Sequence, residues 1–243
     1  MGLDLSGQSG AKMKILAVAD VHSPRFLNEF TEGLKRVSKP DVFLMAGDMI
    51  HRGRVEEIEG VLDAIEARLG TDFPIVACFG NEEYAEIRKS MVAIAGDRID
   101  FLDEKSSIIE ADGVKVGVVG TQGSLDKATN WQRRHIPSIK RIFQRRAARA
   151  SSLLKNVRKK ADRTVLLMHY SPCLETCIGE ETKAFAWLGS RKFYKVVQKQ
   201  QPDLVIHGHV HNSSTHEAWI GTSLVRNVAL PAVGSLTELD LWA

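Results

Sequence analysis

Six short apolar runs recur along the 243-residue sequence, and each has the length of a β-strand. They are KILAVA (14–19), DVFLMA (41–46), PIVACF (74–79), VKVGVV (114–119), TVLLMH (164–169) and DLVIHG (203–208). Between the first three runs, apolar residues recur every three or four positions over Phe26–Val37 and Val55–Leu69, which predicts amphipathic helices. This alternation of strands and helices predicts an α/β protein with a mostly parallel sheet covered on both faces.

The size of the chain fits one domain. A chain of 243 residues, 44% of them hydrophobic, can bury one large core, and we expect a single domain over residues 13–243. Residues 1–12 are small, polar and aperiodic, and we expect them to be a leader outside the fold, either disordered or foreign to the natural chain. Met13 would then be the natural start.

The sequence gives no sign of a membrane segment. No apolar run approaches the roughly 18 residues that a membrane span needs, and the start of the chain lacks the charged and then apolar pattern of a secretory signal. We therefore expect a cytoplasmic protein without membrane partners. Three cysteines are an odd and small number, so we expect Cys78, Cys173 and Cys177 to be buried thiols rather than a disulfide framework.

Metal-ligand side chains follow five of the apolar runs, at the point where each run ends. Ligands of parallel sheets bind beyond the carboxyl ends of the strands, so we expect these side chains to meet. Carboxylates, imidazoles and an amide form a donor set that suits Mn, Fe, Zn or Co. Seven ligands are too many for one ion, and they predict two ions about 3.5 to 4 Å apart with a bridging carboxylate. The seven are Asp20, His22, Asp48, Asn81, His169, His209 and His211.

Five motifs occur in order: ADVH (19–22), AGD (46–48), GNEE (80–83), a lone His169 at a strand end, and GHVH (208–211). In this combination the sequence resembles the calcineurin-like metallophosphoesterases, in particular small prokaryotic phosphodiesterase-like members, from Asp20 to His211. The resemblance implies a four-layer αββα sandwich of two mixed β-sheets flanked by helices. It also implies hydrolysis of phosphomonoesters or phosphodiesters at a dinuclear metal centre.

The same resemblance implies a role for each ligand. One ion would be held by Asp20, His22 and His211. The other would be held by Asn81, His169 and His209. Asp48 would bridge both ions, and a bridging hydroxide would attack phosphorus in line. We expect two divalent ions, with Mn favoured and Fe, Zn, Co or Ni as alternatives, and we expect Glu82, Asp48 and Asn81 to take part in catalysis.

Glu82 departs from the pattern of this family, in which a histidine usually follows the motif asparagine and donates a proton to the departing oxygen. A general acid contributes about 10²–10⁴ in rate, so its absence would matter most for poor leaving groups. Glu82 could be a protonated acid, could contact a metal or pair with an arginine and so shape the pocket, or could be solvated at a helix start. We expect Glu83 to belong to the solvated class.

Residues outside the motifs have simpler expected roles. We expect His207 to be structural. The remaining histidines are expected at the surface or at the pocket rim: His51, His135 and His216. The aromatic candidates for pocket lining are Tyr84, Tyr170 and Trp187. Residues 222–241 alternate with interruptions and predict closing strands of the second sheet.

Residues 126–163 contain thirteen Lys or Arg and two acids, a local balance of +11 in a chain of net charge +3. An apolar stripe at three- and four-residue intervals predicts an amphipathic helix, and hence a basic helical insert at about 126–163. Its basic outer face could be merely solvated, or it could attract nucleic acid or another polyanion. Its apolar stripe could form a seam in a homo-oligomer. The stripe is Ile136, Ile139, Phe143, Ala147, Ala150, Leu154 and Val157.

From these features we expect a metal-dependent phosphoesterase that hydrolyses phosphodiester bonds. A phosphomonoesterase or a nuclease would use the same site. A non-catalytic interaction module with the same fold is a second alternative. Such modules are expected to lose metal ligands, whereas all seven ligands are present in this chain.

Overall fold

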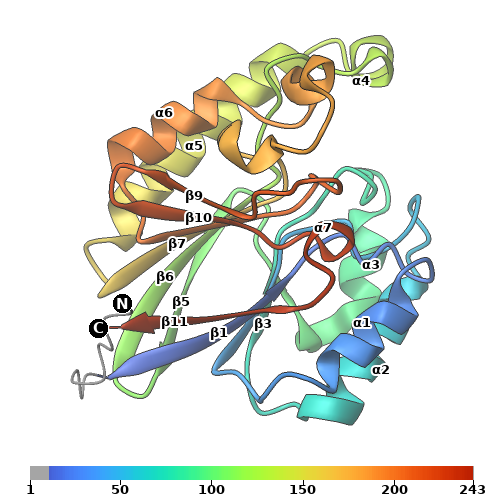
Figure 1. Cartoon of the computed structure of the whole chain (residues 1–243), viewed down its shortest axis with the longest axis vertical. Helices are drawn as coiled ribbons and strands as arrows, with labels where there is room; N and C mark the ends of the chain where they lie inside the picture. The colour runs from blue at the N-terminus through green and yellow to red at the C-terminus, as the bar shows by residue number, and fades with distance from the viewer. Residues whose placement is uncertain (1–10, 243) are drawn as a thin grey trace.

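The computed structural model describes residues 11–242 of the chain. Two β-sheets pack face to face and helices cover the outer face of each sheet, so the molecule has four layers (Figure 1). The expected αββα sandwich of two mixed sheets is therefore confirmed. Residues 1–10 of the expected leader lie outside the described residues, and the first strand begins at Lys12, one residue before the expected start of the domain.

The first sheet has the strand order β11-β1-β2-β3-β4. Its strands are β1 (Lys12–Val18), β2 (Val42–Met45), β3 (Ile75–Ala77), β4 (Asp100–Phe101) and β11 (Thr237–Trp242). Strands β1 to β4 are parallel, and β11 runs antiparallel to β1. We expected residues 222–241 to close the second sheet, and this is wrong for β11, which pairs with the free edge of β1 in the first sheet. In this position Leu239 and Leu241 pack between the two sheets.

The second sheet has the strand order β5-β6-β7-β8-β10-β9. Its strands are β5 (Lys105–Ala111), β6 (Val114–Thr121), β7 (Arg163–Met168), β8 (Leu204–His207), β9 (Glu217–Ile220) and β10 (Ser223–Asn227). The four inner strands are parallel, and the edge strands β5 and β9 are antiparallel to their neighbours. All six apolar runs of the sequence are strands, which confirms the expected pattern.

Helices cover the two outer faces of the sandwich (Figure 1). The first sheet is covered by α1 (Leu27–Leu34), α2 (Glu57–Leu69) and α3 (Arg88–Ala95). The second is covered by α5 (Ile139–Val157) and α6 (Arg191–Gln200). The short elements are α4 (Asn130–His135), α7 (Leu230–Val233) and the 3₁₀ turns η1 (Gly96–Arg98), η2 (Glu175–Cys177) and η3 (Thr182–Trp187). The helices expected over 26–37 and 55–69 are confirmed as α1 and α2.

Three apolar clusters join the four layers. The central one packs Ile15 of β1 against Val116 and Val118 of β6, between the two sheets. The other two lie between each sheet and its helices. Because the inner strands are buried on both faces, polar side chains on them are costly, and the polar motifs stand where the strands end.

Helix α5 confirms the amphipathic helix expected in the basic segment. Its buried residues Ala150, Leu154 and Val157 pack against Leu166 of β7 and Phe193 of α6. The apolar stripe is therefore part of the chain's own core, and the hypothesis that it forms an oligomer seam is wrong. Within this segment, α5 is thus part of the helical layer that covers the second sheet.

Arg146 is an exception to the outward-facing charges of α5. Its guanidinium donates to Gln122 Oε1 at 2.7 Å and lies 3.7 Å from the carboxylate of Glu104. Gln122 also accepts a hydrogen bond from Arg88 at 2.9 Å and donates to the Gly80 carbonyl at 2.9 Å. Through Gln122, α5 therefore helps to fix the loop that follows β3.

We expect Arg146→Ala to lower the free energy of unfolding by about 3 kcal/mol, because the substitution leaves Gln122 and Glu104 without their half-buried cation. Arg145 is exposed on the same helix, and Arg145→Ala should change the free energy by less than about 0.5 kcal/mol. Urea unfolding of both variants measures the difference. Equal changes in the two variants would contradict the structural role of Arg146.

Two further expectations concern the whole described chain. Within residues 11–242, no helix combines the length and the apolarity needed to cross a membrane. Cys78, Cys173 and Cys177 are buried and free, as expected for packed thiols.

Candidate metal centre

Five strands bring the predicted ligands to one place, at the edge where the two sheets meet. The loops after β1, β2 and β3 of the first sheet carry Asp20, His22, Asp48 and Asn81. The loops after β7 and β8 of the second sheet carry His169, His209 and His211. All seven lie within two neighbouring groups, so the structure brings together every ligand that the sequence predicts.

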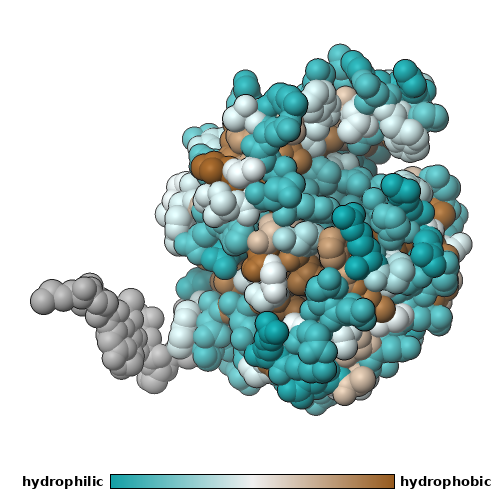
Figure 2. Space-filling view, turned by 45° about the vertical axis from the view of Figure 1, so that its right-hand side comes forward, coloured by the Kyte–Doolittle hydropathy of each residue, from teal (hydrophilic) through white to brown (hydrophobic). Residues whose placement is uncertain are grey.

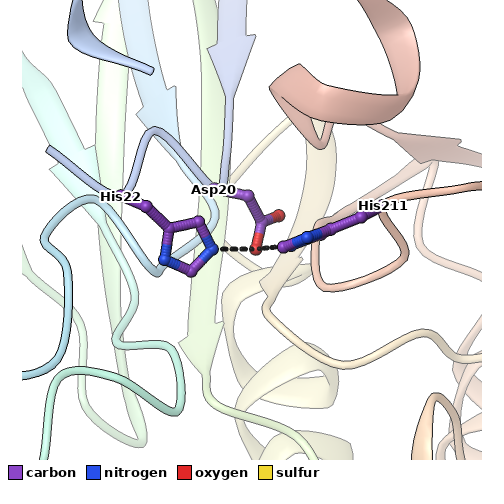
Figure 3. A group of neighbouring side chains, drawn as sticks. All are labelled: Asp20, His22 and His211. Carbon is purple, nitrogen blue, oxygen red and sulfur yellow. Dashed lines mark hydrogen bonds and ion pairs between the residues drawn. The ribbon is translucent and has the colours of Figure 1, made fainter. Parts of the chain in front are cut away.

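Asp20, His22 and His211 form the first group (Figure 3). Asp20 Oδ1 lies 2.9 Å from His211 Nε2 and 3.5 Å from His22 Nε2. Asp20 Oδ2 accepts the backbone N–H of His209 at 2.7 Å. The carboxylate of Asp20 therefore connects the end of β1 in the first sheet to the loop after β8 in the second.

Asp48, His169 and His209 form the second group. His169 Nε2 lies 3.4 Å from Asp48 Oδ2 and 3.1 Å from Asn81 Oδ1, so Asn81 joins this group. The rings of His169 and His209 meet edge to face, with their centroids 5.0 Å apart. A carboxylate, an amide oxygen and two imidazoles thus surround one point.

Asp48 lies between the two groups. Its Oδ2 is 3.4 Å from His169 Nε2 in the second group and 3.9 Å from His22 Nε2 in the first. Its Oδ1 accepts the N–H of Glu82 at 2.7 Å, which orients the carboxylate. This is the position that a carboxylate shared by two ions would need.

Four of the predicted ligands have left-handed backbone conformations, which residues other than glycine seldom adopt. They are Asp20 (φ 60°), His22 (φ 44°), Asp48 (φ 51°) and His209 (φ 69°). Such conformations cost about 1–3 kcal/mol each and gather at functional sites, where the surrounding structure holds them in place. The backbone itself therefore marks these strand ends as a site.

Two motif glycines leave room for carboxylates from other loops. A Cβ at Gly80 would overlap Asp48 Oδ1, and a Cβ at Gly208 would overlap Asp20 Oδ2. Any side chain at either position would displace a predicted ligand. The glycines of GNEE and GHVH are thus required by close packing at the site.

Protein acceptors fix the tautomers of two ligand histidines. His169 Nδ1 donates to the Ala46 carbonyl at 2.9 Å, and His209 Nε2 donates to the Trp187 carbonyl at 3.1 Å. A carbonyl oxygen only accepts, so these nitrogens carry protons, and the opposite nitrogens face the site, where a metal ion would use their lone pairs. Outer acceptors of this kind are typical of metal-binding histidines.

The carboxylate of Glu82 orients the ring of His22, as the two backbone carbonyls orient His169 and His209. His22 Nδ1 lies 3.1 Å from Glu82 Oε2. His22 Nε2 is buried near Asp20 and Asp48 and has no hydrogen-bond partner among residues 11–242. A buried nitrogen beside two carboxylates is a suitable ligand for a cation, so the residues present fit divalent metal ions.

The carboxylates give the site a preference for positive charge. Burial lowers the pKa of His22, but the nearby carboxylates of Asp20 and Glu82 outweigh burial and raise this pKa to about 10. Burial also opposes the charged form of His169, whose pKa the carboxylate of Asp48 raises to about 9. The pKa of His209 is lowered to about 4 by burial and by the charge of His169. The acids thus stabilise a cation in their midst, either a proton or a metal.

Glu82 has further contacts that bear on its role. Its Oε2 accepts the Arg52 N–H at 2.7 Å and lies 3.1 Å from His51 Nδ1. Burial raises the pKa of Glu82, but the bonds from His22 and from the Arg52 N–H outweigh burial and lower this pKa to about 2. These contacts favour an ionised carboxylate that shapes the pocket over a protonated acid or a freely solvated side chain. Its partners are histidines and a backbone N–H rather than an arginine side chain.

The expectation that Glu83 is solvated is wrong. Glu83 is 1% exposed, and its carboxylate accepts the N–H groups of Gly80 at 2.5 Å, Asp48 at 2.8 Å and Met49 at 2.7 Å. Burial and the charge of Asp48 raise its pKa to about 7. Glu83 thus joins the loop after β2 to the loop after β3. The signal in the sequence is its place three residues after Gly80, from which a side chain can fold back onto the glycine N–H.

We expect Glu83→Gln to destabilise the protein strongly. An amide places an NH₂ group where one carboxylate oxygen accepts backbone N–H bonds, and each buried donor left without a partner costs about 1–3 kcal/mol. Thermal unfolding of the metal-free protein measures the loss. Glu86→Gln, at an exposed acid of the same loop, is the matched control and should leave the melting temperature within about 1 °C of wild type. A wild-type melting temperature for Glu83→Gln would contradict this role.

The other polar and aromatic residues border the centre. The buried ring of Tyr170 lies 4.7 Å from that of His209, in keeping with a pocket residue, and burial raises the pKa of Tyr170 to about 12. His207 is buried and bonded to Thr176 at 2.9 Å, as expected for a structural histidine. His51 belonged to no motif, and its signal in the sequence is its place three residues after Asp48.

Comparisons with known proteins agree with this geometry. The family model for calcineurin-like phosphoesterases matches residues 13–213. No curated protein matches the sequence significantly. Among solved structures, phosphopantetheinyl hydrolase (PptH) from Mycobacterium tuberculosis superimposes with a TM-score of 0.69 and 14% identity, over 95% of this chain and 96% of that one. The protein TT1561 of Thermus thermophilus has a TM-score of 0.56 and 14% identity, with 93% and 98% covered. The purple acid phosphatase PPD1 from yellow lupin (Lupinus luteus) seeds has a TM-score of 0.52 and 13% identity, with 96% and 46% covered.

The two-sheet sandwich and its paired ligand groups define a protein with a candidate dinuclear metal centre at the ends of its strands. Because the family model covers most of the sequence, the chain belongs to the calcineurin-like phosphoesterase family. This family uses dinuclear metal centres, and the two groups around Asp48 consist of side chains that could hold metal ions. The likeness to the three solved structures adds agreement in fold.

Proposed function

We propose that the protein is a metal-dependent phosphoesterase. Asp20, His22 and His211 would hold one divalent ion, and Asn81, His169 and His209 would hold the other. The observation that carries this proposal is the position of Asp48, whose Oδ2 lies 3.9 Å from a histidine nitrogen of the first group and 3.4 Å from one of the second.

The metals and the protein would have separate tasks. Two bound ions would neutralise the charge of a phosphate group and make water a better nucleophile. The donor set suits Mn, which we favour, as well as Fe, Zn, Co and Ni. The protein would hold the ions with imidazoles whose direction is fixed: the Ala46 and Trp187 carbonyls orient His169 and His209, and Glu82 orients His22.

The charge of Glu82 supports a phosphodiester as the substrate. A monoester carries about −1.5 to −2 charges at neutral pH, whereas a diester carries one. An ionised Glu82 would place a negative charge 3.1 Å from His22 Nδ1, beside the centre, and this charge would repel a dianion more than a monoanion. An ionised Glu82 also cannot donate a proton to the departing oxygen, so good leaving groups should be favoured.

One assay tests the site and the substrate class together. The protein is stripped of metal, reloaded with Mn²⁺, and given bis-p-nitrophenyl phosphate or p-nitrophenyl phosphate. We expect Mn²⁺-dependent cleavage with a higher kcat/KM for the diester. We expect Asp48→Asn to lower kcat at least about 100-fold and to reduce bound metal, because both ions would share this carboxylate. Unchanged metal content and turnover in Asp48→Asn would refute the dinuclear assignment.

Glu82→Gln tests the role of the charge. The variant keeps an acceptor for the Arg52 N–H but has no negative charge, so we expect the ratio of diester to monoester kcat/KM to fall about tenfold. Glu56→Gln, at an exposed acid in the segment leading into α2, should leave the ratio unchanged. If Glu82→Gln slows both substrates equally, Glu82 acts only by positioning His22.

A nuclease is a second candidate within this class, because the outer face of α5 exposes Lys140, Arg141 and Arg145. An oligonucleotide would then be a diester substrate of the same centre, attracted by these cations. The half-buried Arg146, which contacts Gln122 and Glu104, would not contribute to such attraction.

A further inference from the structure

Two aromatic rings stand beside the candidate centre and take no part in holding metal. Tyr84 follows Glu83 in the loop after β3, and Trp131 lies on α4. Their ring centroids are 6.3 Å apart and their planes are tilted by 31°. His135 stacks on Trp131 at 4.8 Å, yet Trp131 is 52% exposed. About half of Trp131 therefore stays open to a further planar group.

The surrounding residues hold both rings in place. At the start of α4, Thr129 and Gln132 exchange hydrogen bonds, and Gln132 Nε2 donates to the Tyr170 hydroxyl at 3.3 Å. Tyr84 packs against Gly53, where an added Cβ would lie 2.9 Å from its ring. Rings that are already ordered lose little conformational entropy when a ligand binds, which favours stacking.

Tyr84 lies close to the candidate centre, and Trp131 contacts Tyr84. Tyr84 is three residues from the predicted ligand Asn81, so their Cα atoms are at most about 10 Å apart. Burial raises the pKa of Tyr84, and the negative charges of Glu82 and Asp48 raise it further. The Tyr84 hydroxyl therefore lies within the electric field of these carboxylates. Figure 2 shows the surface hollowed at the right of the view, between the upper part of the molecule, where α4 lies, and the lower part.

We propose that Tyr84 and Trp131 form a subsite for a nucleobase joined to the scissile phosphate. The proposal rests on the proposed function and narrows its substrate class to nucleoside phosphodiesters. A centroid separation of 6.3 Å is that of two rings in contact, so a base would stack on the exposed part of this pair rather than between the rings. Because every base has a π-face, such a subsite would accept different bases.

The test compares two diesters with the same leaving group, thymidine 5′-(p-nitrophenyl phosphate) and ethyl p-nitrophenyl phosphate. With the Mn²⁺-loaded protein, we expect a lower KM for the thymidine ester. Trp131→Ala should raise that KM about 5- to 100-fold, the range that base stacking provides, and should change the KM of the ethyl ester less than about twofold. Trp131→Phe should retain most of the wild-type preference.

Trp219 provides the matched control. It is 61% exposed on the edge strand β9, outside the pair, so Trp219→Ala should alter neither KM. An equal effect of Trp131→Ala on both esters, or no effect on either, would overturn the proposal.

A binding measurement separates this proposal from the proposed function. If the wild-type protein cleaves neither ester, the proposed function fails, and calorimetric titration with thymidine 5′-monophosphate and with ribose 5-phosphate still tests the subsite. Tighter binding of the thymidine compound that is lost in Trp131→Ala supports the nucleobase subsite. Equal binding of the two compounds by the wild-type protein overturns it.

Discussion

A single buried carboxylate, that of Glu83, joins the two loops on which the candidate centre is built. It accepts the N–H of Gly80 in its own loop and the N–H groups of Asp48 and Met49 in the preceding one. A buried ionisable group is costly unless its partners satisfy it, and here the partners are backbone donors that cannot move without unfolding a turn. Because those donors belong to the turn that carries Asp48, Glu83 fixes the carboxylate that lies between the two ligand groups. The position of each group relative to the other depends on this contact.

The rest of the centre is held by contacts that run between the sheets. Asp20 of the first sheet accepts the N–H of His209 from the second, and His169 of the second sheet donates to the Ala46 carbonyl of the first. Left-handed backbone at four ligands shows that the loops are held in conformations that they would not adopt alone. The site therefore belongs to the assembled sandwich rather than to any one motif, which is why the motifs predict ligand types and the fold supplies their directions.

Local sequence patterns predicted the strands that are buried on both faces and the ligands that stand at their ends. The six inner runs were predicted, and the seven candidate ligands were placed at strand ends, because continuous apolar runs and ordered polar motifs are local signals. The edge strands β4, β5 and β9 are short or partly exposed and lack that signal. Strand β11 was assigned to the wrong sheet because its partner depends on which edge is open. Glu82 and Glu83 are adjacent and chemically identical, yet one faces the pocket and the other the interior, since only tertiary packing decides the direction of each side chain.

The pairing of β1 with β11 has a consequence for synthesis on the ribosome. Strand β1 leads directly to Asp20 and His22, and one of its edges is completed only by residues 237–242. At the usual 5–20 residues per second, the ribosome needs roughly 10–40 s to make the chain between these two strands. During that time the nascent protein carries an unpaired strand edge, which invites pairing with other chains. The segment with Asp20 and His22 is thus made long before it is enclosed.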